Sequence, residues 1–137
     1  MIKIDFESIK TRDEAIKWAI DSGYAGNKTE AAWWLSKNIP KESYFQKKIM
    51  KYLEGLKSSG EDIFFWKEQA GPYQRKGIPD IIVCLKGNFI ALEVKRPYIG
   101  RPSPLQNETI GKIKAAGGKA ALVSTAGDVK KLFEELI

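Results

Sequence analysis

The spacing of hydrophobic and polar residues changes character about sixty residues into the chain. Before that point apolar residues recur every three or four positions, which is the period of an amphipathic helix. After it, short runs of β-branched and aromatic residues are separated by glycine and asparagine, which is typical of strands and turns. The pattern predicts a helical first part followed by a mixed α/β part.

Capping residues locate three helices in the first part. Thr11 begins a T-x-x-E capping box, which predicts a helix over 12–22. Asn27 begins a second helix, and a third extends from near Pro40 to Gly60. The third helix has a clear apolar side, formed by Phe45, Ile49, Tyr52, Leu53 and Leu56.

The second part is predicted to contain four strands and two helices. The expected strands cover 63–66, 80–85, 89–95 and 120–124. Gly87-Asn88 is a turn signal between the second and third strands. Ser103 caps a helix that ends near Ala116, and a final amphipathic helix follows the fourth strand. The predicted order from the third helix on is helix, three strands, helix, strand, helix.

This order predicts a fold class. Alternating helices and strands form a mixed sheet flanked by helices, which is an α/β architecture in one layered domain. Residues 40–137 form the expected core of this domain, and residues 1–39 form an N-terminal helical extension.

Three charged residues interrupt the apolar runs of the predicted hairpin: Asp80, Glu93 and Lys95. If Gly87-Asn88 forms a two-residue turn, Asp80 lies opposite Lys95 and Glu93 lies opposite Ile82. Because side chains alternate between faces along a strand, all three charges then project from one face. A loop with an odd number of residues would send the two carboxylates to opposite faces.

Two carboxylates on one face repel each other, and a divalent cation such as Mg²⁺ is a natural partner for them. Asp80 and Glu93 supply one oxygen each, and the backbone carbonyl of Val94 could add a third. Lys95 is placed to orient an attacking water or to stabilise charge on a phosphate. The alternative is structural, since a Glu-x-Lys pair on a strand is commonly an exposed ion pair and Pro-Asp is commonly a turn.

Two further polar residues are candidates for the same site. Glu42 shares the apolar side of its helix with Phe45 and Ile49. It is either a first-turn acid that favours the helix dipole or a third acid of the metal site. Gln106 is the capping partner of Ser103 and a possible active-site donor, although capping alone explains its presence.

The composition narrows the possible chemistry. The chain has no histidine, which excludes Ser-His and Cys-His catalysis and histidine-containing zinc sites. The single cysteine, Cys84, excludes an internal disulfide and a cysteine zinc site, and favours a cytoplasmic location. A net charge of +6 favours a polyanionic partner. The charged N-terminus lacks a signal peptide, and no apolar run reaches the length of a membrane span.

The motifs, taken in order, resemble a known family. Glu42, the run GIPD ending at Asp80, the run EVK from Glu93 to Lys95, and Gln106 are similar to the pattern of the virus-type replication-repair nuclease (VRR-NUC) domain. This family belongs to the PD-(D/E)xK nuclease superfamily. The similarity extends to ESYFQKKIMKYLEGLKSSG and AAGGKAALVST, and covers the chain from about Lys41 to its end.

The resemblance implies a restriction-endonuclease-like core and a metal-dependent phosphodiesterase. Asp80 and Glu93 match the metal ligands of the family, and Glu42 matches the helix acid. Lys95 matches the catalytic lysine, and Gln106 matches the glutamine of the following helix. Stand-alone members, often from phages, are similar to dimers that cut branched DNA.

Cations near the expected cleft are candidates for binding DNA phosphates, although a solvated surface charge explains any one of them equally well. They are Lys67, Arg75, Lys76, Arg96 and Arg101. Most large aromatics are expected to lie in the core rather than to form base-stacking platforms. They are Trp18, Trp33, Trp34, Phe64, Phe65 and Trp66. Trp33 and Trp34 are adjacent, so they cannot both face one narrow helix stripe, and one is a candidate contact with a partner subunit.

The leading hypothesis is a Mg²⁺- or Mn²⁺-dependent endonuclease that resolves four-way (Holliday) junctions in DNA as a homodimer. Two symmetric cuts need two active sites at a fixed separation, which a two-fold dimer supplies. One alternative is a nuclease acting on flaps, nicks or single strands. Another, from a different class, is a non-catalytic nucleic-acid-binding module.

Overall fold

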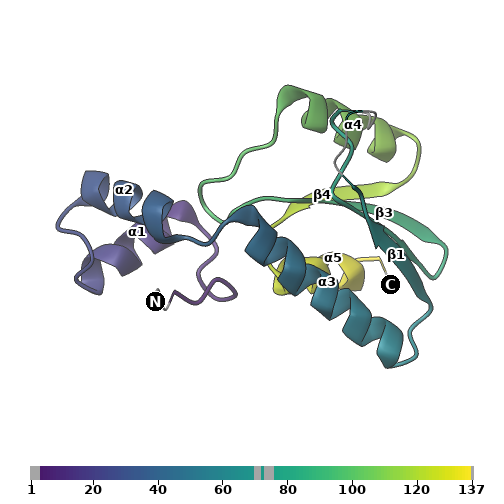
Figure 1. Ribbon diagram of the computed structural model, residues 1–137, viewed down its shortest axis with the longest axis horizontal. Helices are drawn as coiled ribbons and strands as arrows, with labels where there is room; N and C mark the ends of the chain where they lie inside the picture. Colours follow the sequence, from purple (N-terminus) through teal and green to yellow (C-terminus); the bar gives the residue numbers. More distant parts are fainter. Residues whose placement is uncertain (1–3, 70–71, 73–75, 137) are drawn as a thin grey trace.

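A computed structural model of the protein describes residues 4–69, 72 and 76–136 (Figure 1). The helices are α1 (Arg12–Asp21), α2 (Lys28–Asn38), α3 (Glu42–Ser58), α4 (Pro104–Ala115) and α5 (Ala126–Glu134). The strands are β1 (Ile63–Lys67), β2 (Ile81–Leu85), β3 (Asn88–Val94) and β4 (Lys119–Val123). Every predicted element is present, so the α/β class is confirmed. None of these helices combines the length and apolarity needed to cross a membrane.

The sheet places the hairpin strands in its centre. Its order is β1-β2-β3-β4, with antiparallel pairing except between β3 and β4, which run parallel. The parallel pair is connected through α4, as a crossover requires. Figure 1 shows α4 on one side of the sheet and α3 with α5 on the other. The result is a mixed sheet between two unequal helical layers.

The larger core lies between the sheet and the layer formed by α3 and α5. Ile49 and Leu53 of α3 are fully buried against sheet residues such as Ile81, Val83 and Leu92. Each such side chain contributes about 1.5–3 kcal/mol through burial. On the α4 side the buried cluster is small: within the described residues it consists of Ile82, Ala91 and Ala120, with Ile110 and Ile113 of α4 packed against it.

The hairpin turn differs from the prediction by one residue. Leu85 pairs with Asn88, so the turn residues are Lys86 and Gly87, with φ of 50° and 86°. This is the two-residue turn that needs a left-handed backbone at both positions, and glycine adopts that backbone without strain. The Asn88 side chain instead donates a hydrogen bond to the Leu85 carbonyl (3.1 Å).

The corrected turn shifts the hairpin register by two positions. Ile82 lies opposite Ala91, not opposite Glu93. Continuing the ladder by one residue places Asp80 opposite Glu93, where the sequence had suggested Lys95. Because the shift is even, every side chain stays on its predicted face.

The two N-terminal helices pack against each other beside the sheet domain (Figure 1). The two adjacent tryptophans do face different ways. Trp34 stacks on Tyr24 with ring centroids 4.4 Å apart and approaches Trp18, whereas Trp33 is 64% exposed. The expectation of a core position is therefore wrong for Trp33.

The same expectation is wrong for two residues of β1. Phe64 is 69% exposed and Trp66 is 43% exposed, while Phe65, on the other face, packs against the main core. The reason is the position of α4, which packs against β4. Edge strand β1 therefore keeps an open face on the α4 side of the sheet.

Candidate active site

Asp80 and Glu93 meet at the end of the hairpin farthest from its turn. Asp80 immediately precedes β2, and Glu93 is the penultimate residue of β3. The Asp80 carboxylate accepts a hydrogen bond from the backbone amide of Val94 (2.8 Å), which holds it across the end of β3. The amide of Glu68 donates to the Asp80 carbonyl (2.8 Å) and ties the same residue to β1.

Glu93 is an acid buried without a partner. Its side chain is 1% exposed, and neither carboxylate oxygen has a hydrogen-bond partner among the described residues. Burial raises the pKa of Glu93 to about 9; Asp80 adds to the shift through a hydrogen bond that requires the Glu93 proton and through its charge, while Lys95 opposes it. A buried acid with unsatisfied oxygens and a raised pKa is typical of functional sites.

Lys95 and Glu42 complete the cluster of charges. The Lys95 ammonium lies 3.7 Å from the Glu42 carboxylate, and Lys95 is the more buried of the two. Burial raises the pKa of Glu42, and the charge of Asp80 acts in the same direction while Lys95 opposes it. The first residue of α3 and the end of β3 therefore bring four predicted site residues together, although they are up to 53 positions apart in sequence, from 42 to 95.

Gln106 lies in the first turn of α4, and its side-chain oxygen Oε1 accepts a hydrogen bond from the backbone amide of Ser103 (2.8 Å). The predicted capping box is therefore present. The same turn contacts the loop before Asp80, because a Cβ on Gly77 would lie 2.9 Å from the Leu105 carbonyl oxygen. Gly77 also has φ of +81°, so only glycine fits this close approach without strain. An active-site role for Gln106 stays a prediction.

The residues fit a hard divalent cation, which was the predicted cofactor. The unpartnered oxygens of Glu93 and the adjacent Asp80 carboxylate are the oxygen donors that Mg²⁺ prefers. Within residues 4–69, 72 and 76–136, no three histidine, cysteine, aspartate or glutamate side chains are grouped closely enough to hold a metal by themselves. This matches magnesium sites in which one or two carboxylates are supplemented by waters or carbonyls, such as that of Val94.

The candidate phosphate-binding cations have different environments. Lys67, Lys76 and Arg101 are exposed, as a role in DNA binding requires. Arg75 lies outside the described residues.

Arg96 has a structural role in the fold. Its guanidinium donates to the backbone carbonyls of Pro40 (3.0 Å), Ser36 (3.1 Å) and Ile39 (2.6 Å). It therefore ties the end of α2 to the sheet domain. These bonds use the N–H groups of Nε and Nη2, three of the five donors of a guanidinium, so phosphate binding by Arg96 stays a prediction beside this structural role.

Sequence reasoning missed Glu68. Its hydrogen bond to Asp80 continues the β1–β2 ladder, so Glu68, Asp80 and Glu93 occupy one row on one face. The Glu68 carboxylate accepts a hydrogen bond from the indole N–H of Trp66 (2.7 Å). Only the register of β1 against β2 places Glu68 here, and the sequence contains no signal for that register.

Comparison with known proteins agrees with this geometry. The fold is similar to a solved structure described as a VRR_NUC domain, with a TM-score of 0.55 and 26% sequence identity. The match covers 68% of this chain and 94% of that one. No protein-family model matches the chain, and no curated protein does. The resemblance predicted from the motifs is therefore confirmed at the level of the fold, which is similar to that of a VRR_NUC domain structure.

Proposed function

We propose that this chain, whose fold is similar to that of a VRR_NUC domain, is a metal-dependent endonuclease that cuts branched DNA, most simply four-way junctions as a homodimer. The observation that carries the proposal is Glu93, a fully buried carboxylate with no partner beside a second carboxylate. Such a pair is unfavourable in a structural role, since an unsatisfied buried group costs about 1–3 kcal/mol. A cation that binds both acids relieves this cost.

The chemistry divides between a cation and the residues of the chain. Mg²⁺ or Mn²⁺ held by Asp80 and Glu93 would polarise the scissile phosphate and lower the pKa of the attacking water. The Val94 amide fixes the Asp80 carboxylate in position. Lys95 places a positive charge beside the two acids, where it stabilises the extra negative charge of the transition state or orients the water. Glu42 holds the Lys95 ammonium in place.

The exposed cations position the substrate. Lys67, Lys76 and Arg101 contact backbone phosphates, which gives affinity without sequence preference. The net charge of +6 favours this partner. The homodimer is proposed because two symmetric cuts across a junction need two sites.

Cleavage of a labelled substrate panel tests the proposal. The panel contains a four-way junction, a flap, a nicked duplex and a single strand, each with Mg²⁺, Mn²⁺ or EDTA. Asp80→Ala and Lys95→Ala should abolish cutting while DNA binding is retained, and Glu54→Ala, on the exposed face of α3, serves as the matched control. Cutting that persists in EDTA or in either active-site variant contradicts the mechanism.

The other outcomes separate the competing functions. Preferred cleavage of the flap, nick or single strand identifies a different nuclease specificity at the same site. Binding without cleavage of any substrate identifies a non-catalytic module. Sedimentation velocity of the protein with and without junction DNA tests the homodimer directly.

A further inference from the structure

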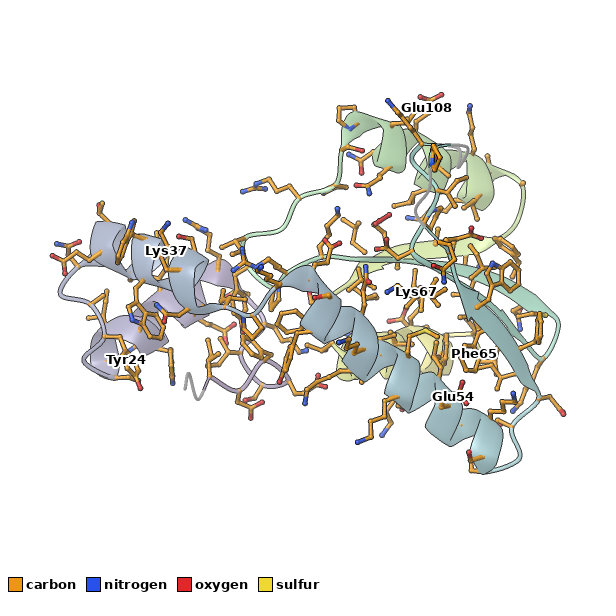
Figure 2. All side chains as sticks on the ribbon, viewed as in Figure 1. Tyr24, Lys37, Glu54, Phe65, Lys67 and Glu108 are labelled. Carbon is orange, nitrogen blue, oxygen red and sulfur yellow. The ribbon has the colours of Figure 1, made fainter. Side chains whose placement is uncertain are left out.

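Three aromatic side chains lie exposed on the face of the sheet that carries the two acids. Phe64 is 69% exposed, Trp66 is 43% exposed and Phe89 is 45% exposed. We call them the aromatic platform. Exposed aromatic clusters of this kind are unusual on a monomer and mark binding surfaces. Figure 2 labels Phe65, the residue between Phe64 and Trp66 on β1, well away from the N-terminal helices.

The strand register connects the platform to the acids. Phe64, Cys84 and Phe89 form one row across β1, β2 and β3. The next row on the same face begins with Trp66, and the one after it contains Asp80 and Glu93. Successive rows on a face are two residues apart, which is about 6.6 Å along a strand. The platform therefore ends one row before the carboxylates.

The platform is ordered before any ligand binds. The rings of Phe64 and Trp66 have centroids 5.8 Å apart, and the Trp66 indole N–H is held by Glu68 (2.7 Å). Beside Trp66 and Phe89 is a hollow of about 450 Å³, walled on its other side by residues of α4 such as Lys112 and Ile113. A flat ligand can enter this hollow without displacing a buried side chain, and little ordering entropy is lost.

We propose that the aromatic platform stacks unpaired nucleobases of the DNA strand that is cut. Two properties favour this occupant. The platform is continuous with a site proposed to act on phosphodiesters, so this step rests on the proposed function. The chain is also basic, which suits a ligand that is flat and apolar along its bases and anionic along its backbone. Lys112 lines the hollow and is paired with Glu108 of the same helix (3.0 Å).

The consequence is a preference for substrates with unpaired bases next to the scissile phosphate. A base in a duplex is stacked on its neighbours and shows only its edge, so it has no free face to offer Trp66. A flap or a single strand exposes these faces, and a four-way junction exposes them where the base pairs at its branch point open. Stacking accepts every base, so the platform selects for DNA structure with little sequence preference.

Binding of two matched oligonucleotides in EDTA tests the proposal. One is a fluorescein-labelled oligothymidylate, and the other is an abasic strand of equal length that keeps the phosphates and lacks the bases. Phe64→Thr and Trp66→Thr should each weaken oligothymidylate binding about fivefold or more in fluorescence anisotropy, as expected for the loss of one stacked base. Binding of the abasic strand should stay unchanged. Trp66→Phe, which keeps a ring, should restore most of the affinity.

Trp33→Ala is the matched control, because Trp33 is about as exposed as Phe64 but lies on α2, away from the sheet. It should leave both affinities unchanged. Equal losses on the two strands, no loss on either, or no binding of oligothymidylate by the wild type would overturn the proposal. So would a dimer in sedimentation equilibrium that Phe64→Thr dissociates, since the platform would then be a contact between copies of the chain.

The test separates this proposal from the proposed nuclease activity. A wild-type protein that discriminates thymidylate from abasic strands but cuts no substrate leaves the platform in place and rejects the nuclease assignment. A protein that cuts DNA but binds thymidylate and abasic strands equally well keeps the nuclease assignment and rejects the platform.

Discussion

Replacing Glu93 by glutamine tests whether this acid serves to bind a cation and lowers the stability of the folded protein when no cation is bound. In the folded protein the carboxylate is buried and unpartnered, and burial beside Asp80 raises its pKa to about 9. The neutral form is therefore favoured at pH 7 when no cation is bound. Glutamine keeps the shape of this neutral form and never ionises.

The pKa difference sets the size of the effect. In the unfolded chain Glu93 has an ordinary pKa near 4.3. Between that value and about 9, folding takes up a proton, so the free energy of unfolding falls as the pH rises. Each pH unit removes about 1.4 kcal/mol, which amounts to roughly 4 kcal/mol by pH 7. A glutamine amide also remains in an apolar site, so we expect the variant to gain about 1–3 kcal/mol.

Thermal unfolding in EDTA measures this gain. At pH 8 the melting temperature of Glu93→Gln should exceed that of the wild type by roughly 3–10 °C, and the difference should shrink at pH 5. Glu54→Gln, an exposed change on α3, should show no difference at either pH. Adding Mg²⁺ should stabilise the wild type and leave Glu93→Gln unaffected, which narrows the gap.

A wild type that is more stable than Glu93→Gln at pH 8 in EDTA would refute the reasoning. It would mean that the carboxylate has a favourable partner in solution and serves the fold. A gap that grows on acidification would also refute it, because the sign of the pKa shift would be wrong.

Three further predictions concern stability and use urea unfolding. Arg96→Ala should lower the free energy of unfolding by about 2–3 kcal/mol, and Arg96→Lys should not restore it, because one ammonium cannot replace a guanidinium that serves three carbonyls. Asp128→Asn should cost about 1–2 kcal/mol at pH 7, and this cost should shrink as the pH falls below the ordinary aspartate range. Burial opposes ionisation of Asp128, but hydrogen bonds from backbone amides and the charge and hydrogen bond of Lys10 outweigh burial and lower the pKa of Asp128. The stability that the Asp128 carboxylate contributes is therefore present above its unfolded pKa and is lost as the pH falls through its folded pKa. Lys86→Asn should stabilise the hairpin by about 0.5 kcal/mol, since asparagine accepts the left-handed backbone more readily; an unchanged or lower stability would contradict the turn assignment.

Local chemistry determined most of the secondary structure and part of the site. Thr11, Asn27 and Ser103 accept the capping hydrogen bonds that their sequence context predicts. The placement of Asp80 and Glu93 on one face needed only the two-residue period of a strand and an even loop. This is why the one-residue error in the turn changed the pairing and left the site intact.

Tertiary structure decided which groups are buried and which are free. Nothing near Glu93 in the sequence indicates that both its carboxylate oxygens lack a hydrogen-bond partner. Nothing near Arg96 indicates that its guanidinium binds backbone carbonyls at the end of α2. The aromatic run of β1 has the pattern of a buried strand, yet Phe64 and Trp66 are exposed because α4 packs toward the other edge of the sheet. A side chain's face follows from the covalent period of its own strand, whereas its burial depends on distant segments that cover that face, and these are specified only when the whole chain folds.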